Sequence, residues 1–166
     1  MSHPSTLRDE LETLYGECAA ALDEADWDRW PTFFAETCSY KITTKENVDR
    51  GFPVALMNCE SRGMMLDRVH AMNELQFVIP RIFRRLYSGI RIVKTDSDPV
   101  TANLPGVLHT QCSFAVFETR VGEHTTVFAA GRFVDVLCRE GDRLKFHQRT
   151  CILDTYVIPN TMPFPL

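Results

Sequence analysis

The N-terminal part of the chain carries apolar residues at helical spacing. Between Thr6 and Asp26, the residues Leu7, Leu11, Leu14, Cys18 and Ala21 recur at three- and four-residue steps. This period places them on one stripe of a helix. Thr6 and Asp9 have the spacing of a capping box, with Asp in place of the usual Glu. The pattern predicts an amphipathic helix over residues 6–26.

An aromatic-rich segment follows this predicted helix. Pro31 suits the first position of a short second helix, because its missing N–H costs little there. Burial is the dominant use of aromatic rings, so the four rings around it are interpreted as core anchors rather than as an aromatic ligand box. They are Trp27, Trp30, Phe33 and Phe34.

Two short elements precede the second half of the chain. Cys38, Tyr40 and Ile42 alternate with polar residues, which predicts a half-buried strand. Residues 52–59 form either a further short strand or an irregular crossing. Ser61 is placed to begin a third helix, with Met65, Val69 and Met72 on one face. This helix is predicted to end before Pro80.

The second half is predicted to form four long strands, over residues 82–94, 107–121, 125–138 and 144–157. Turn signals around Gly122 and Gly141 join the last three, which must therefore be antiparallel. A strand of about 14 residues would reach about 45 Å if straight, so the sheet must curl. Gly89 and Gly131 are the expected bend or bulge sites.

Within the strand at 107–121, one face is apolar and the other polar. Leu108, Cys112, Phe114 and Val116 point one way, and His109, Gln111 and Ser113 point the other. Helices followed by a long curled antiparallel sheet define the α+β class. We therefore expect a cone, in which the sheet wraps around the N-terminal helices.

Composition limits the function. The 166 residues suit one domain, residues 1–166, with 45% apolar and 24% charged residues. The formal charge of −4 gives no broad attraction to nucleic acid or anionic membranes. No apolar run is long enough to span a bilayer, and no secretory signal is evident, so a cytoplasmic protein is expected.

The residues that could bind a metal or act in catalysis form few recognisable sequence motifs. The six cysteines are widely spaced and are interpreted as buried, reduced thiols. No cysteine precedes a histidine at Rieske spacing, and at least 14 residues separate any two consecutive histidines. Phosphate-binding loops and nucleophile elbows are also missing. A metal site assembled from distant strands, for instance from His109, His147 and Asp135, stays open.

An acid–base pocket is the best catalytic candidate. Tyr40, Asp135 and His147 could face into the cone, where a desolvated carboxylate would have a raised pKa. The favoured alternative is structural, with Asp135 paired to Arg149 on a neighbouring strand.

Two further features suggest contacts between subunits. One basic run, read as a subunit interface or a solvated sheet face, comprises Arg81, Arg84, Arg85, Arg91 and Lys94. The tail 157–166 is apolar and proline-rich, and is expected to lie as an extended arm on another subunit.

Seven short segments lie in a fixed order along nearly the whole chain. The segments are Asp26-Trp27-Asp28, Trp30-Pro31-Thr32-Phe33-Phe34, Cys38-Ser39-Tyr40, Met65-Leu66-Asp67-Arg68, Gly131-Arg132-Phe133-Val134-Asp135, Gln148-Arg149 with Asp154, and Pro165-Leu166. Their order resembles the small (β) subunits of aromatic-ring-hydroxylating oxygenases. The segments Trp-Pro-Thr-Phe-Phe and Cys-x-Tyr are most similar to those of the salicylate 5-hydroxylase and terephthalate dioxygenase small subunits.

This resemblance implies a cone-shaped NTF2-like (cystatin-like) fold and a role as a structural subunit. It implies a large (α) subunit as partner, an α3β3 complex with a trimer of each chain, and a carboxylated aromatic substrate such as salicylate. The large subunit would hold the Rieske [2Fe-2S] cluster and the mononuclear Fe(II), with electrons from NAD(P)H through a reductase. The family offers no catalytic, cofactor-binding or metal-binding residues for this chain.

Two functions from other classes compete with this interpretation. One is a stand-alone isomerase or dehydratase that uses the acid–base pocket. The other is a dimeric binding adaptor of the nuclear transport factor type.

Overall fold

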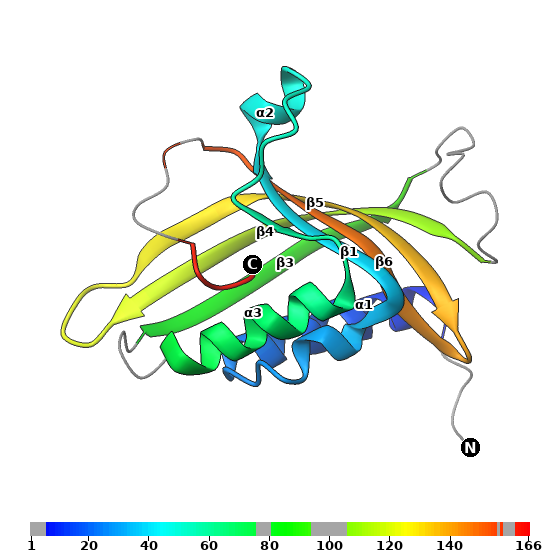
Figure 1. The fold of residues 1–166 in the computed structure, drawn as a ribbon, viewed down its shortest axis with the longest axis horizontal. Helices are drawn as coiled ribbons and strands as arrows, with labels where there is room; N and C mark the ends of the chain where they lie inside the picture. Colours follow the sequence, from blue (N-terminus) through cyan, green and yellow to red (C-terminus); the bar gives the residue numbers. More distant parts are fainter. Residues whose placement is uncertain (1–5, 76–80, 94–105, 156, 158–161) are drawn as a thin grey trace.

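The computed structural model describes residues 6–75, 81–93, 106–155, 157 and 162–166 (Figure 1). Its elements are α1 (Leu7–Asp23), the 3-10 helix η1 (Trp30–Phe33), β1 (Phe34–Thr44), α2 (Lys45–Asp49), β2 (Met57–Cys59), α3 (Arg62–Leu75), β3 (Arg81–Ile92), β4 (Leu108–Arg120), β5 (Thr126–Glu140) and β6 (Arg143–Leu153).

The strands form one six-stranded sheet in the order β2-β1-β6-β5-β4-β3. The strands β4, β5 and β6 are antiparallel neighbours, as the turn signals predict. The strand β3 pairs antiparallel with β4 as well. In contrast, β1 pairs in parallel with β6, a contact across more than 100 residues that no local pattern indicates. Figure 1 shows the sheet arching over α1 and α3, which confirms the expected α+β cone; the sheet does not close on itself.

The two glycines expected at bends behave differently. Gly89 has φ +66° and lies in a register shift between Ser88 and Arg91, so the expected bulge in β3 is confirmed. Gly131 keeps regular pairing with Leu153, and the bulge prediction there is wrong. A Cβ atom at Gly131 would lie 2.1 Å from the Ile152 carbonyl oxygen, so this glycine allows β6 to approach closely.

The helix signals are confirmed at the starts of α1 and α3. The Thr6 hydroxyl accepts a hydrogen bond from the Asp9 N–H (3.2 Å), and the Asp9 carboxylate accepts one from the Thr6 N–H (2.9 Å). This capping box begins α1, which ends at Asp23, three residues earlier than expected. Ser61 accepts from the Met64 N–H at the start of α3.

The core contains the apolar residues that the helix and strand patterns select. Trp30, Met65, Met72, Phe133 and Phe146 are all fully buried. The aromatic anchors Trp27, Trp30, Phe33 and Phe34 also belong to this core, so their structural interpretation is confirmed.

A projecting segment between β1 and β2 contains a helix that the sequence analysis does not predict. Only Met57–Cys59 of the region 52–59 is a strand, and Lys45–Asp49 forms an unpredicted helix, α2. The Thr44 hydroxyl accepts from the Asn47 N–H to begin α2, and Gly51 turns the chain back with φ +66°. Residues 45–56, here called the finger, project from the sheet on the side away from α1 and α3 (Figure 1).

The described end of the tail does not extend onto another subunit, and that prediction is wrong. Phe164 and Leu166 are buried in the core of the same chain. The Phe164 ring stacks on Trp27 with centroids 5.3 Å apart. The Leu166 N–H donates to the Tyr40 hydroxyl (2.8 Å), which fixes the last residue inside the cone. Residues 158–161 of the predicted arm lie outside the described residues.

Candidate functional site

A buried ion pair occupies the centre of the cone. Antiparallel pairing of β5 with β6 places Asp135 directly opposite Arg149. The Arg149 Nη2 atom donates to Asp135 Oδ2 at 2.9 Å, and its Nε lies 3.2 Å from both carboxylate oxygens. Both side chains are at most 1% exposed. The pairing of Asp135 with Arg149 is therefore confirmed.

One hydroxyl group binds the Asp135 carboxylate, and a second hydroxyl binds the first. Tyr15, from α1, donates to Asp135 Oδ2 at 2.5 Å. The Tyr15 oxygen also lies 2.8 Å from the Thr110 hydroxyl on β4. Neither residue stands out in the sequence, although Tyr15 lies four residues after Leu11 and so falls beside the apolar stripe of α1. The carboxylate is thus held by a cation and a phenol.

Aromatic rings enclose the Arg149 guanidinium. Its central carbon lies 3.8 Å from the ring centroid of Phe146, 4.2 Å from Phe133, 4.8 Å from Tyr15 and 6.0 Å from Tyr87. Cations over ring faces are attracted by the ring quadrupole, most strongly where water is excluded. Arg149 and its rings therefore fill the interior of the cone.

The electrostatics of this centre follow from burial and pairing. Burial raises the pKa of Asp135, and the neighbouring Arg149 cation opposes that rise. Burial disfavours the Arg149 cation, but the Asp135 carboxylate keeps the pKa of Arg149 well above its usual value. Burial and the nearby carboxylate also raise the pKa of Tyr15. The pair therefore holds two opposite charges together inside the core.

The other two residues of the predicted acid–base pocket lie elsewhere. The Tyr40 hydroxyl accepts from the Leu166 N–H, and the Cys151 thiol donates to it at 3.4 Å. His147 is nearly buried, with Nδ1 2.7 Å from the Thr37 carbonyl oxygen of β1. Within the described part of the chain, neither Tyr40 nor His147 forms a hydrogen bond with Asp135.

Three surface grooves run along α1, with volumes of about 500, 640 and 460 Å³. None of them is lined by Tyr40, Asp135 or His147. The predicted acid–base trio therefore has no route to a ligand through these grooves.

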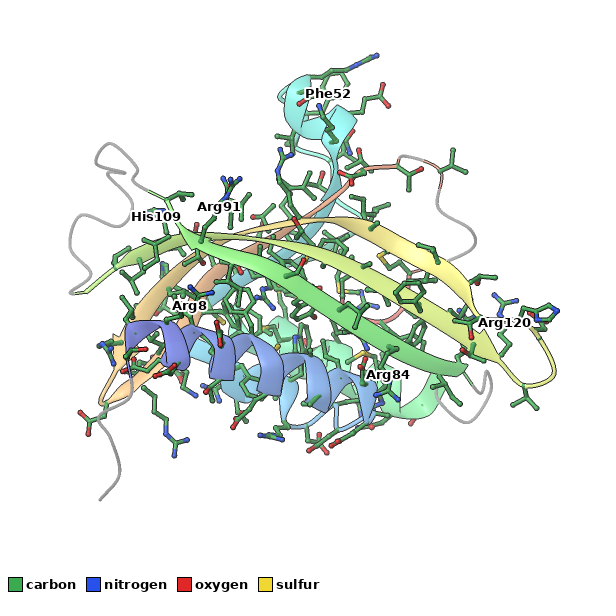
Figure 2. All side chains as sticks on the ribbon, turned by 180° about the vertical axis from the view of Figure 1, so that it is seen from behind. Arg8, Phe52, Arg84, Arg91, His109 and Arg120 are labelled. Carbon is green, nitrogen blue, oxygen red and sulfur yellow. The ribbon has the colours of Figure 1, made fainter. Side chains whose placement is uncertain are left out.

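The possible metal site assembled from distant strands is not formed. Across the described ranges, no group of three His, Cys, Asp or Glu side chains is placed to hold a metal ion. His109 lies on the outer side of the sheet (Figure 2), whereas Asp135 is paired with Arg149 inside it. All six cysteines are free and buried, as the sequence predicts. No helix in the described part of the chain is long and apolar enough to cross a membrane.

The basic run on β3 does not form one surface. Arg81 pairs with Glu118 at 2.8 Å, and Arg85 pairs with Asp23 at 2.7 Å, both as nearly buried pairs. The Arg84 side chain remains mostly exposed. Arg91 donates to Gln111 on the outer side. Alternation along the strand separates these arginines into inner and outer sets, and Lys94 lies outside the described residues.

Comparison with known proteins identifies the family. A family model described as the ring hydroxylating beta subunit matches residues 17–160. The chain belongs to this family. The β subunits of this family are the small components of oxidoreductase complexes, and each pairs with a larger α subunit.

Three relatives place this β subunit more closely. The anthranilate 1,2-dioxygenase small subunit of Burkholderia cepacia is 29% identical over 157 residues, covering 95% of this chain and 92% of that protein. The terephthalate 1,2-dioxygenase terminal oxygenase subunit beta 2 of Comamonas sp. is 26% identical over 148 residues, covering 89% and 91%. The crystal structure of a β subunit from Novosphingobium aromaticivorans, described as part of an aromatic-ring-hydroxylating dioxygenase, has 30% identity, a TM-score of 0.79 and 93% coverage of both chains. The expected NTF2-like fold is confirmed by these β subunits.

Proposed function

We propose that this β subunit is the non-catalytic, structural component of a Rieske non-haem iron oxygenase. The filled interior carries the proposal. Arg149, Asp135 and Tyr15 occupy the centre of the cone, and Leu166 is bound to Tyr40 beside it. A single domain over residues 1–166 would then supply shape and contacts, while catalysis would reside in the large subunit.

The complex would contain three copies of each subunit, in an α3β3 arrangement within the cytoplasm. Its large subunit would hold the Rieske [2Fe-2S] cluster and the mononuclear Fe(II), and would receive electrons from NAD(P)H through a reductase. The small-subunit relatives named for anthranilate and terephthalate dioxygenases support a carboxylated aromatic substrate, for which salicylate is one candidate.

Co-expression with the large subunit tests the partnership. We expect the two chains to co-purify in equal amounts, with iron in the complex and none retained by the isolated β subunit. The complex should hydroxylate a carboxylated aromatic acid faster than the matching hydrocarbon without the carboxylate. Failure to co-purify, or stoichiometric iron in the isolated chain, would contradict the proposal.

A variant inside the cone separates this function from the isomerase or dehydratase alternative. Tyr15→Phe removes the hydroxyl that donates to Asp135 but keeps the ring. We expect turnover of the complex to stay within about twofold of the wild type, because no reacting atom lies in the interior. A loss of turnover in a variant with unchanged circular dichroism would instead favour an acid–base site in this chain.

A further inference from the structure

Four sulfur-bearing side chains gather where the start of α3 meets the edge of the sheet formed by β2 and β1. They are Cys38 of β1, Cys59 of β2, and Met64 and Met65 of α3. The structural role proposed for the β subunit uses none of them. Thiols and thioethers are soft ligands, so a group of them is a candidate site for a soft metal ion.

A direct sulfur–sulfur contact joins β1 to α3. The Cys38 thiol donates to the Met65 thioether, with 3.7 Å between the two sulfur atoms. These side chains are 4% and 0% exposed, so both sulfurs lie inside the protein. Two sulfur ligands that each lie about 2.3 Å from one tetrahedral ion are about 3.8 Å apart. The spacing of Cys38 and Met65 is therefore that of two ligands of a single ion.

The register of the sheet brings a second thiol to the same side. Cys59 pairs with Tyr40, and Cys38 lies two residues before Tyr40, so the two thiols are diagonal neighbours on one face. The Cα atoms of such neighbours are about 7–8 Å apart, a distance that one ion bound to both side chains can bridge. Burial raises the pKa of Cys38 to about 11, and the nearby Cys59 adds to this rise, which agrees with their proximity.

Met64 links the buried sulfurs to solvent. Its side chain is 42% exposed, and its sulfur accepts a hydrogen bond from the Glu60 N–H at 3.3 Å. The Cys59 thiol donates to the Met64 carbonyl oxygen at 3.9 Å, so this methionine lies directly beside Cys59. A metal ion therefore has a short path inward that begins at an exposed thioether.

Two arginines lie near the thiols and favour their ionised form. Burial raises the pKa of both thiols, and a neighbouring cation opposes that rise in each, Arg62 for Cys38 and Arg68 for Cys59. Arg62 pairs with Glu36 at 3.5 Å, and the Glu36 side chain is itself 85% exposed. A monovalent ion held by two thiolates leaves one excess negative charge, which these arginines offset.

We propose that Cys38, Cys59 and Met65 form a binding site for one Cu(I) ion, with Met64 as the ligand at its entrance. Soft thiolate and thioether ligands favour Cu(I). Zn(II) sites use four thiolate, imidazole or carboxylate ligands, and among the described residues no third His, Cys, Asp or Glu joins the two thiols. Binding releases the two thiol protons to water and leaves the ion as Cu(I).

Titration of the reduced, full-length β subunit with Cu(I) in the absence of oxygen tests this site. A coloured Cu(I) chelator competes for the ion and reports the Kd. We expect one Cu(I) per chain and two protons released for each ion bound. X-ray absorption of the complex should show sulfur ligands alone. These measurements use the unaltered chain, so they do not depend on the folding of any variant.

Variants of the four residues assign the ligands. Cys38→Ser and Cys59→Ser each remove a thiolate and should raise the Kd more than about 100-fold, beyond the cost of losing a residue that only supports a ligand. Met65→Leu conserves the side-chain volume and should raise the Kd about tenfold. Met64→Leu should slow the uptake of Cu(I) and leave the Kd unchanged.

Matched controls lie at buried positions away from these four residues. Cys112→Ser on β4 and Met72→Leu, two turns further along α3, make the same chemical changes and should leave the Kd unchanged. Circular dichroism checks the fold of each variant.

Four results would overturn the inference. They are the absence of Cu(I) binding, tighter binding of Zn(II) than of Cu(I), nitrogen or oxygen ligands in the X-ray absorption, and binding that survives both cysteine variants. Co-purification with the large subunit and the iron content of the complex are separate measurements. Failure of the copper site is therefore distinguishable from failure of the proposed function.

Discussion

Two arginines on neighbouring strands show how the two sides of one sheet differ. Arg149 on β6 points inward, is 1% exposed, and is held by Asp135 and four aromatic rings. Arg132 on β5 points outward among small and apolar side chains. The inward charge is fully paired inside the core, whereas the outward charge is only partly buried on the other side of the sheet. The residue type is the same; its position in the pleat decides its role.

Removing the inward cation should have the largest effect. Arg149→Met leaves the Asp135 carboxylate buried without its cation, and we expect the free energy of unfolding to fall by about 3–5 kcal/mol. The double variant Asp135→Leu/Arg149→Met should lose less than the single variant, because no unpaired charge remains. Urea unfolding of both variants measures the difference. If the double variant were at least as unstable as Arg149→Met, the unpaired charge of Asp135 would not be the main cause of the lost stability.

The C-terminal tail, which packs on the inner side of the sheet, should contribute almost as much to the free energy of unfolding. Phe164→Ala removes a ring that packs on Trp27 and Phe83, and should lower the free energy of unfolding by about 3 kcal/mol. Val157→Ala, at a position 65% exposed, is the control and should change it by less than about 0.5 kcal/mol. Equal unfolding curves for both variants would mean that the tail is not anchored in solution.

The buried thiols should make the free energy of unfolding fall as the pH rises through the alkaline range. Burial raises the pKa of Cys38 and of Cys112 to about 11, and that of Cys151 to about 12. The unfolded chain ionises these thiols near their ordinary pKa of about 8.5. Their contribution is therefore complete below that pH and is lost as pH rises through the folded values.

Unfolding by urea under reducing conditions, from pH 8 to pH 11, measures this dependence. Stability should decline over that range, and Cys112→Ala should decline less steeply. An unchanged slope in Cys112→Ala would show that this thiol does not contribute.

Substitutions on the outward side of the sheet should change the free energy of unfolding least. Phe52→Ser/Val54→Ser alters two exposed side chains of the finger. We expect the free energy of unfolding of the isolated β subunit to change by less than about 0.5 kcal/mol. Thermal unfolding at low protein concentration measures it. A loss of more than about 2 kcal/mol would mean that the finger supports the fold itself and would remove the contrast between the two sides.

The sequence predicts much of this fold because the relevant signals are local. The capping box of Thr6 with Asp9 sets where α1 begins, and alternation along residues 107–121 selects the buried side of β4. The pairing of Asp135 with Arg149 could also be predicted from the sequence, because the two residues lie on adjacent predicted strands. Tyr15 was not, since a tyrosine beside an apolar stripe looks like ordinary core until its hydroxyl meets Asp135 across 120 residues.

The amino-acid sequence by itself determined the starts of α1 and α3 and the buried faces of the strands, because each depends on neighbours a few residues apart. Only the tertiary structure decided the parallel contact of β1 with β6, the inward path of Phe164 and Leu166, and the filling of the cone by Arg149. These features join residues that are far apart along the chain. An apolar tail can be buried against any apolar surface, and an arginine can pair with any nearby carboxylate. Only the packed chain shows which surface and which carboxylate they meet.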